Sequence, residues 1–188
     1  MNSADPTTSG PSYRTERLRG AWLLVLPFLV FSRPTAALLF AGGLISLLGL
    51  LVRAVAAGSI LKDERLADGG VYGRLRHPLY LGSFFLGLGL SMAGGRWWFP
   101  LFFSALFGWI YFLTIRAEVR ELESRFGERF QSYRAQVPAF LPRFRPYCSG
   151  GPSRGFRVEV YLRNKEWQAF IGALFGYALL WARMTLFG

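Results

Sequence analysis

The chain is poor in the residues that build disulfides and metal centres. It holds one cysteine, Cys148, and one histidine, His77, among 188 residues. A single cysteine excludes an internal disulfide and a cluster of cysteine ligands. A lone histidine, with no carboxylate cluster inside an apolar run, predicts that there is no metal site. Lysine is scarce too, with two lysines against 20 arginines, a ratio typical of a GC-rich bacterial genome.

Apolar residues are in excess. Hydrophobic residues make up 52% of the chain and aromatic residues 17%, and the mean hydropathy is positive at +0.28. This composition predicts a membrane protein. The formal net charge of +11 would suggest a nucleic-acid partner in a soluble chain. Here the basic residues lie mostly in short loops beside apolar runs, so we expect no nucleic-acid partner.

Charge-free runs predict an all-α, polytopic membrane bundle of about five spans. The predicted spans cover residues 20–32, 35–57, 78–95, 97–115 and 164–188. The first run is short and follows several arginines, which would also fit a signal peptide, but no small-residue cleavage pattern comes after it. Only Gly94, Gly95 and Arg96 separate the third and fourth runs, so we expect a tight antiparallel helical hairpin there.

Other segments have a different character. Residues 1–13 are polar and aperiodic, which predicts a disordered tail. After the fourth span, Leu122, Phe126, Phe130 and Tyr133 recur at helical spacing, which predicts an amphipathic helix over 116–135 on the cytoplasmic side. A basic stretch rich in glycine, serine and proline predicts a cytoplasmic linker over 143–163. We therefore expect one membrane core over 14–142, followed by the linker and the last span.

The arginines orient the bundle. Only Arg33, Arg96 and Arg183, of 22 basic residues, fall on the side opposite the main loops. Basic loops stay in the cytoplasm, so the N-terminus and the stretch 69–77 are predicted to face it. The expected location is a bacterial cytoplasmic membrane.

A polar stretch before the third span carries the most chemistry. Residues 69–82 hold Tyr72, Arg76, His77 and Tyr80. Pro78 suits the first turn of a helix, whose start favours an anionic group. The hairpin should bring Glu118 next to this stretch, giving donors and an acceptor beside lipid. Such a site suits a zwitterionic cofactor acting on a lipid-borne substrate. The same pattern also fits a topology determinant that contacts headgroups.

Two blocks resemble a known superfamily. Residues 70–82 read G-V-Y-G-R-L-R-H-P-L-Y-L-G, which is similar to the pattern G-P-Y-x-x-x-R-H-P-x-Y-x-G. Residues 118–142 resemble a second pattern, E-E-x-x-L-x-x-x-F-G, followed by Y and V-P-x-x-x-P. Both patterns belong to the isoprenylcysteine carboxyl methyltransferase and phospholipid methyltransferase superfamily. The resemblance covers about 49–142.

The resemblance implies an integral membrane enzyme that takes S-adenosylmethionine from the cytosol and a lipophilic acceptor from the bilayer. It implies that Arg53 positions the substrate. The cofactor-binding residues that it implies are Gly70, Tyr72, Arg76, His77, Pro78, Tyr80 and Glu118, with Asn164 and Glu166 added from an R-N-x-E segment.

The chain departs from the patterns at two positions. Val71 replaces the proline of the first block, and Val119 replaces the second glutamate of the other. The residues offer no dedicated base beyond His77 and the glutamates, which favours a carboxylate or thiol acceptor over an amine. Two alternatives stay open: a non-enzymatic scaffold or lipid-binding protein, and a membrane lipid or sterol reductase.

Overall fold

The computed structural model describes residues 25–59, 69–145, 147 and 155–187, and in these residues it contains helices and no strand. The helices are α2 (Ala36–Ser59), α3 (Pro78–Ala93), α4 (Trp98–Gln136), α5 (Val158–Arg163) and α6 (Trp167–Phe187). A further helical stretch covers residues 25–31. The predicted all-α class is confirmed. The predicted tail, residues 1–13, lies outside the described residues.

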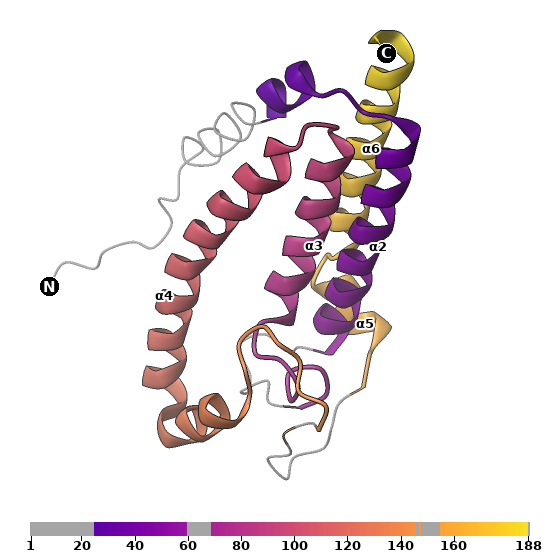
Figure 1. Cartoon of the computed structure of the whole chain (residues 1–188). Coiled ribbons are helices and arrows are strands. Elements are labelled where there is room, and N and C mark those ends of the chain that lie inside the picture. Colours follow the sequence, from indigo (N-terminus) through magenta and orange to yellow (C-terminus); the bar gives the residue numbers. More distant parts are fainter. Residues whose placement is uncertain (1–24, 60–68, 146, 148–154, 188) are drawn as a thin grey trace, which may run out of the picture.

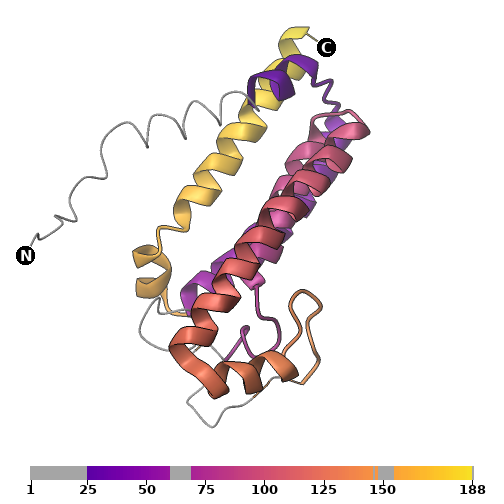
Figure 2. The same cartoon turned by 90° about the vertical axis from the view of Figure 1, so that its left-hand side faces the viewer.

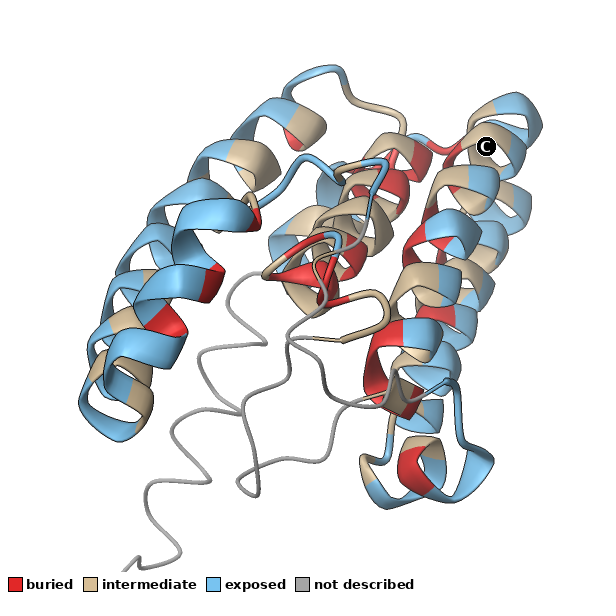
Figure 3. Ribbon diagram, turned by 90° about the horizontal axis from the view of Figure 1, so that it is seen from below, coloured by how far each residue is buried: buried red, intermediate tan, exposed pale blue. Residues whose placement is uncertain are grey.

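Three of the described helices, α2, α4 and α6, are long and apolar enough to cross a membrane. α3 has 16 residues, about 24 Å of helix, and runs alongside α2 and α6 (Figure 1, Figure 2). Large apolar side chains such as Phe40, Leu101 and Trp109 are exposed, as expected where lipid is the solvent. Figure 3 shows that exposed residues cover most of α4 and the outer faces of the other helices. The chain is an integral membrane protein.

The helical residues 25–31 lie at the end of the bundle where α3 turns into α4. The ring of Phe28 packs on that of Phe99 with centroids 4.7 Å apart, and Arg96 Nε donates to the carbonyl of Phe31 (3.0 Å). The span predicted over 20–32 begins in residues outside the described part, so its crossing of the membrane stays a prediction.

The three arginines assigned to the side opposite the main loops lie at this same end. The amide of Arg33 donates to the carbonyl of Gly94 (2.8 Å). Arg183 Nε donates to the carbonyl of Leu29 (3.3 Å). Together with Arg96 they satisfy backbone groups at helix ends, which otherwise lack partners.

α2 and α3 pack with their backbones in contact. Gly42 faces Gly89 so closely that a Cβ on either would collide with the carbonyl oxygen of the other. Seven residues further along α2, a Cβ on Gly49 would lie 2.5 Å from the carbonyl oxygen of Gly82. Both helices therefore carry glycines seven residues apart on their contact faces. Small residues at this spacing let helices approach closely inside a membrane.

A buried polar contact joins α6 to this pair. Ser46 Oγ donates to the carbonyl of Leu86 (2.9 Å) and lies 2.9 Å from Tyr177 Oη. Ser46 is buried, so each hydroxyl obtains a partner that lipid could not supply. One polar chain thus connects α2, α3 and α6.

α4 is longer than the predicted fourth span. The span expected over 97–115 and the amphipathic helix expected over 116–135 form one helix, interrupted only at Gly127, where φ is 51° and ψ is −129°. Only glycine adopts this conformation readily. The helix therefore bends at Gly127, beyond the point where its sequence turns amphipathic.

The hairpin of α3 and α4 is antiparallel, but it opens away from its short turn (Figure 1). Large aromatic rings lie between the two helices, and the glycine of α3 that faces α4, Gly87, is covered by the ring of Phe103. Phe84 of α3 packs against Phe103 and Phe107 of α4, with centroids 6.0 and 5.4 Å apart. The tight hairpin that we expected is correct at the turn only, since these rings hold the helix axes apart.

Beyond the bend, α4 folds against the loop that precedes α3. Phe130, Tyr133 and Val137 form a buried cluster, with Leu122 and Phe126 packed against it. This confirms the apolar face predicted from their helical spacing. Tyr133 Oη also donates to the carbonyl of Tyr72 (2.8 Å).

The segment predicted as a linker over 143–163 contains the short helix α5 at its end. The amide of Arg157 donates to the carbonyl of Gly58 at the end of α2 (3.0 Å). Lys165 then takes a positive φ of 54°, a value that marks the sharp corner between α5 and α6.

The glycine contact allows a matched test of stability. We expect Gly42→Leu to lower the free energy of unfolding by about 1–3 kcal/mol or more, because overpacking must push α2 and α3 apart. Gly43→Leu is the control, since a Cβ there meets nothing within 4 Å, and it should change stability by less than about 0.5 kcal/mol. Unfolding of the purified protein in detergent measures both, and equal losses would contradict the packing described.

Candidate active site

The site begins where the loop over 69–77 enters α3. Gly70 takes a positive φ of 60°, and the amide of Tyr72 donates to the carbonyl of Gly69 (3.1 Å), so this stretch forms a tight turn. Pro78 lies in the first turn of α3, as its sequence position predicts. His77 immediately precedes it and is buried.

His77 and Tyr80 of this segment meet Glu118 of α4. Tyr80 Oη donates to Glu118 Oε2 (2.9 Å), and His77 Nδ1 lies 3.7 Å from the same oxygen. The rings of His77 and Tyr80 are stacked, with centroids 5.4 Å apart. The structure therefore brings His77 and Glu118 together, as the hairpin argument predicted, with Tyr80 beside both.

His77 carries no charge at neutral pH. Burial, and to a smaller extent the positive charge of Arg76, lowers the pKa of His77 to about 4. Its contact with Glu118 is therefore not an ion pair. Burial likewise raises the pKa of Tyr72 well above its usual value, so this phenol stays protonated as a donor.

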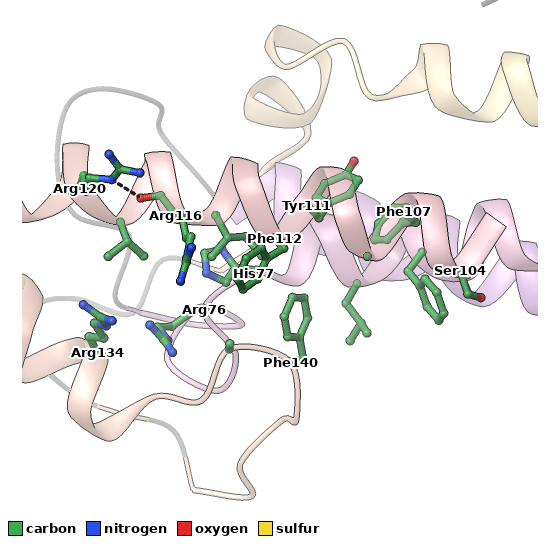
Figure 4. A pocket seen from close by; sticks show the side chains of 16 residues that line it. Arg76, His77, Ser104, Phe107, Tyr111, Phe112, Arg116, Arg120, Arg134 and Phe140 are labelled. Atoms are coloured by element: carbon green, nitrogen blue, oxygen red, sulfur yellow. Dashed lines mark hydrogen bonds between the residues drawn. The ribbon is translucent and has the colours of Figure 1, made fainter. Parts of the chain in front are cut away.

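A cavity of about 820 Å³ lies between α3 and α4, directly beside His77. Its two ends differ in chemistry (Figure 4). The apolar end is lined by Leu81, Phe84, Phe107, Phe112 and Phe140. The other end is lined by Arg76, Arg116, Arg120 and Arg134. Among the described residues that line this cavity, none is acidic.

Three buried polar atoms of the loop have no hydrogen-bond partner within the described part of the chain: Tyr72 Oη, Arg76 Nε and His77 Nε2. Arg76 and His77 line the cavity, whereas Tyr72 does not. A buried donor or acceptor left unpaired costs about 1–3 kcal/mol. Three such atoms in one short loop indicate a place where a polar ligand completes the hydrogen bonding.

Arg53, Asn164 and Glu166 lie elsewhere. Arg53 Nη2 contacts Glu166 Oε2 at 2.7 Å, and its other terminal nitrogen donates to Ser83 Oγ. Asn164 Nδ2 donates to the carbonyl of Ala57 (2.8 Å). None of the three predicted residues lines the cavity beside His77.

The Arg53–Glu166 pair instead borders a separate cavity of about 190 Å³, lined by residues of α2, α6 and the α5 segment. Arg53 packs over Gly82 on the α2 side of α3, while Tyr80 and Phe84 contact α4. Arg53 and Glu166 therefore lie on the α2 side of α3, and the roles predicted for Arg53, Asn164 and Glu166 stay predictions. In this conformation the guanidinium group of Arg53 forms an ion pair with Glu166 and a hydrogen bond to Ser83.

Arg76 was predicted, but the other three arginines of the cavity, Arg116, Arg120 and Arg134, and Phe140 were not among the predicted site residues. Arg116 and Arg120 are one helical turn apart and lie on either side of Val119, which also lines the cavity, so their spacing was a usable signal. Arg134 and Phe140 gave no such signal, since they reach the cavity only after the bend at Gly127.

Comparison with known proteins gives one family match and two similar curated proteins. The family model described as phospholipid methyltransferase matches residues 33–129. The chain is 36% identical over 81 residues to the protein-S-isoprenylcysteine O-methyltransferase of Schizosaccharomyces pombe, covering 43% of this chain and 34% of that protein. It is 33% identical over 103 residues to the cobalt-zinc-cadmium resistance protein CzcN of Cupriavidus metallidurans, covering 55% of this chain and 47% of that protein.

These matches span less than half the length of either relative. No solved structure matches significantly. The family match covers more than half of this chain and contains α2, α3, the His77 loop and Glu118. The chain belongs to the phospholipid methyltransferase family.

Proposed function

We propose that the chain transfers a methyl group from S-adenosylmethionine to a lipophilic acceptor held in the membrane. The observation that carries this proposal is the cavity between α3 and α4. It joins an aromatic slot among membrane helices to a loop with unpaired buried polar atoms. A water-soluble donor and a lipid-soluble acceptor can meet in such a place. Its end with the arginines would face the cytoplasm, as basic loops do.

The residues beside the cavity fit the cofactor. Arg76 and His77 offer unpaired nitrogens, which suit its carboxylate or adenine. Glu118 is a hydrogen-bond acceptor already fixed by Tyr80, and it suits an amino group or ribose hydroxyls. When bound, S-adenosylmethionine supplies an electrophilic methyl group, whose transfer demands positioning and exclusion of water more than acid–base groups.

The charges of the cavity favour an acceptor that is anionic or neutral. Four arginines line it and no acidic residue among those described does so, which disfavours an ammonium headgroup. An amine would also need a base to remove its proton before it could attack. His77, with a pKa of about 4, is too weak a base for that task at neutral pH. We therefore propose a carboxylate or thiol as the acceptor.

One observation keeps a non-enzymatic role as the second candidate. Val119 lines the cavity at the position where the family pattern has a glutamate. An apolar side chain there removes a polar contact from the site. A lipid-binding relative without turnover would tolerate this change, whereas an enzyme must hold the cofactor through Glu118 and the loop.

Cofactor binding tests the site directly. We expect the wild-type protein in detergent to bind S-adenosylmethionine, and Glu118→Gln to bind it roughly tenfold or more weakly, because a hydrogen bond to a charged group is lost. The single variant His77→Ala should also bind S-adenosylmethionine more weakly than the wild type. Titration calorimetry measures both affinities.

Glu121→Gln is the matched control for these variants. Its side chain is 66% exposed on the same helix and contacts Arg125, so the affinity should not change. The pocket assignment fails if the wild type does not bind, or if His77→Ala with Glu118→Gln binds as tightly as the wild type.

The class of acceptor can be read from the product. Incubation with methyl-labelled cofactor and a lipid extract should label a lipid. We expect mild alkali to release the label as methanol, which identifies a carboxyl methyl ester, or the label to stay as an alkali-stable thioether. An N-methylated lipid would overturn the acceptor assignment, and absence of label with both wild type and Val119→Glu would favour the non-enzymatic candidate.

The state of His77 predicts a pH dependence of stability. Its pKa is lower in the folded protein than the usual 6.5, so the unfolded chain takes up the proton first as pH falls. Stability is then complete above about pH 6.5 and falls toward pH 4, by up to about 3 kcal/mol. We expect the free energy of unfolding of His77→Gln to fall less as pH decreases, because this variant has no ring to protonate. Unfolding at neutral pH and at about pH 5 measures it, and parallel losses in both proteins would contradict a buried neutral ring.

A further inference from the structure

The loop that follows α4 exposes apolar side chains at its tip. Leu141 is 80% exposed and Phe144 is 96% exposed, while Phe140 is 43% exposed and lines the cavity. The loop turns back along the bundle, so that its tip reaches the level where α3 begins (Figure 1, Figure 2). The tip, residues 140–142, therefore lies near the membrane end of the loop region, and Phe144 follows it on the returning arm, where the amide of Arg143 pairs with Arg74.

The backbone of this loop is held in place. The amides of Arg76 and His77 donate to the carbonyls of Pro138 (3.0 Å) and Ala139 (3.3 Å), and the amide of Arg143 donates to the carbonyl of Arg74 (3.0 Å). Because the backbone is held by these hydrogen bonds, the side chains of Leu141 and Phe144 stay exposed. Exposed apolar side chains on a fixed backbone mark a surface that contacts something apolar.

The charge around the tip is positive. Arg143 and Arg145 flank Phe144, and Arg74 is exposed on the segment paired with the loop. Neither residues 69–78 nor residues 138–147 contain an aspartate or a glutamate. Aromatic and aliphatic side chains among arginines fit the boundary between acyl chains and anionic headgroups.

We propose that residues 138–145 form a membrane-surface anchor. Leu141 enters the acyl boundary of the leaflet at this end of the bundle, and Phe144 lies at headgroup level between Arg143 and Arg145, which contact anionic headgroups there. The anchor also touches the site. Phe140 lines the cavity and its ring lies 6.1 Å from that of His77, while the loop carbonyls fix the backbone of Arg76 and His77. Contact with lipid thus holds one wall of the cavity, whatever reaction takes place in it.

A single label tests the anchor independently of methyl transfer. Cys148, the only cysteine, is replaced by serine, and Leu141→Cys at the tip then carries an environment-sensitive fluorophore. In vesicles of phosphatidylcholine with phosphatidylglycerol, we expect its emission to shift to the blue and to be quenched by lipids with brominated acyl chains. Glu128→Cys, exposed just after the bend of α4, is the control and should emit as in water without quenching.

The charge contribution is tested in the same vesicles. Arg143→Gln with Arg145→Gln should reduce the blue shift, as should removal of phosphatidylglycerol or addition of salt. Emission at position 141 that matches position 128 in every vesicle would overturn the anchor and indicate a protein partner or no partner. Quenching that is insensitive to charge would overturn the assignment of the two arginines.

Discussion

The backbone contact between α2 and α3 is the constraint on which the rest of the molecule depends. Glycines at two levels remove the side chains that would separate the helices, so α3 can lie against α2 in only one register. That register fixes where Pro78, the first residue of α3, lies along α2, and it thereby fixes the position of His77. Ser46 then attaches α6 to the same pair. The site is therefore built on the most closely packed helix pair of the bundle.

The two neighbours of α3 are packed in opposite ways, and the cavity is the result. Toward α2 the contact is made by backbone, whereas toward α4 it is made by rings such as Phe84 and Phe107. Rings hold the axes apart and leave apolar space between them, which opens at the polar loop. One helix thus serves as a fixed wall on one face and as a binding surface on the other.

Sequence reasoning predicted the parts of the site that local rules determine. A three-residue turn forces α3 and α4 to be neighbours, which placed Glu118 near His77 correctly. The family resemblance, and not the turn, added Glu166 to the cofactor site. In the structure Glu166 pairs with Arg53 on the α2 side of α3, and charge and family pattern alone do not tell which face of α3 a side chain reaches. Arg134 and Phe140 could not be predicted, since their positions depend on a bend at Gly127 that the hydrophobic periodicity of the sequence does not indicate.

Because α4 bends at Gly127, the number of residues before the bend decides where the rest of the chain points. Glu118 must face His77, and nine residues later the chain must turn in one direction so that Phe130, Tyr133 and Val137 reach the loop. Each residue added to or removed from that interval would rotate everything downstream by about 100°. The second half of α4 would then point away from the cavity. The spacing between Glu118 and Gly127 is therefore as much a part of the site as the residues themselves.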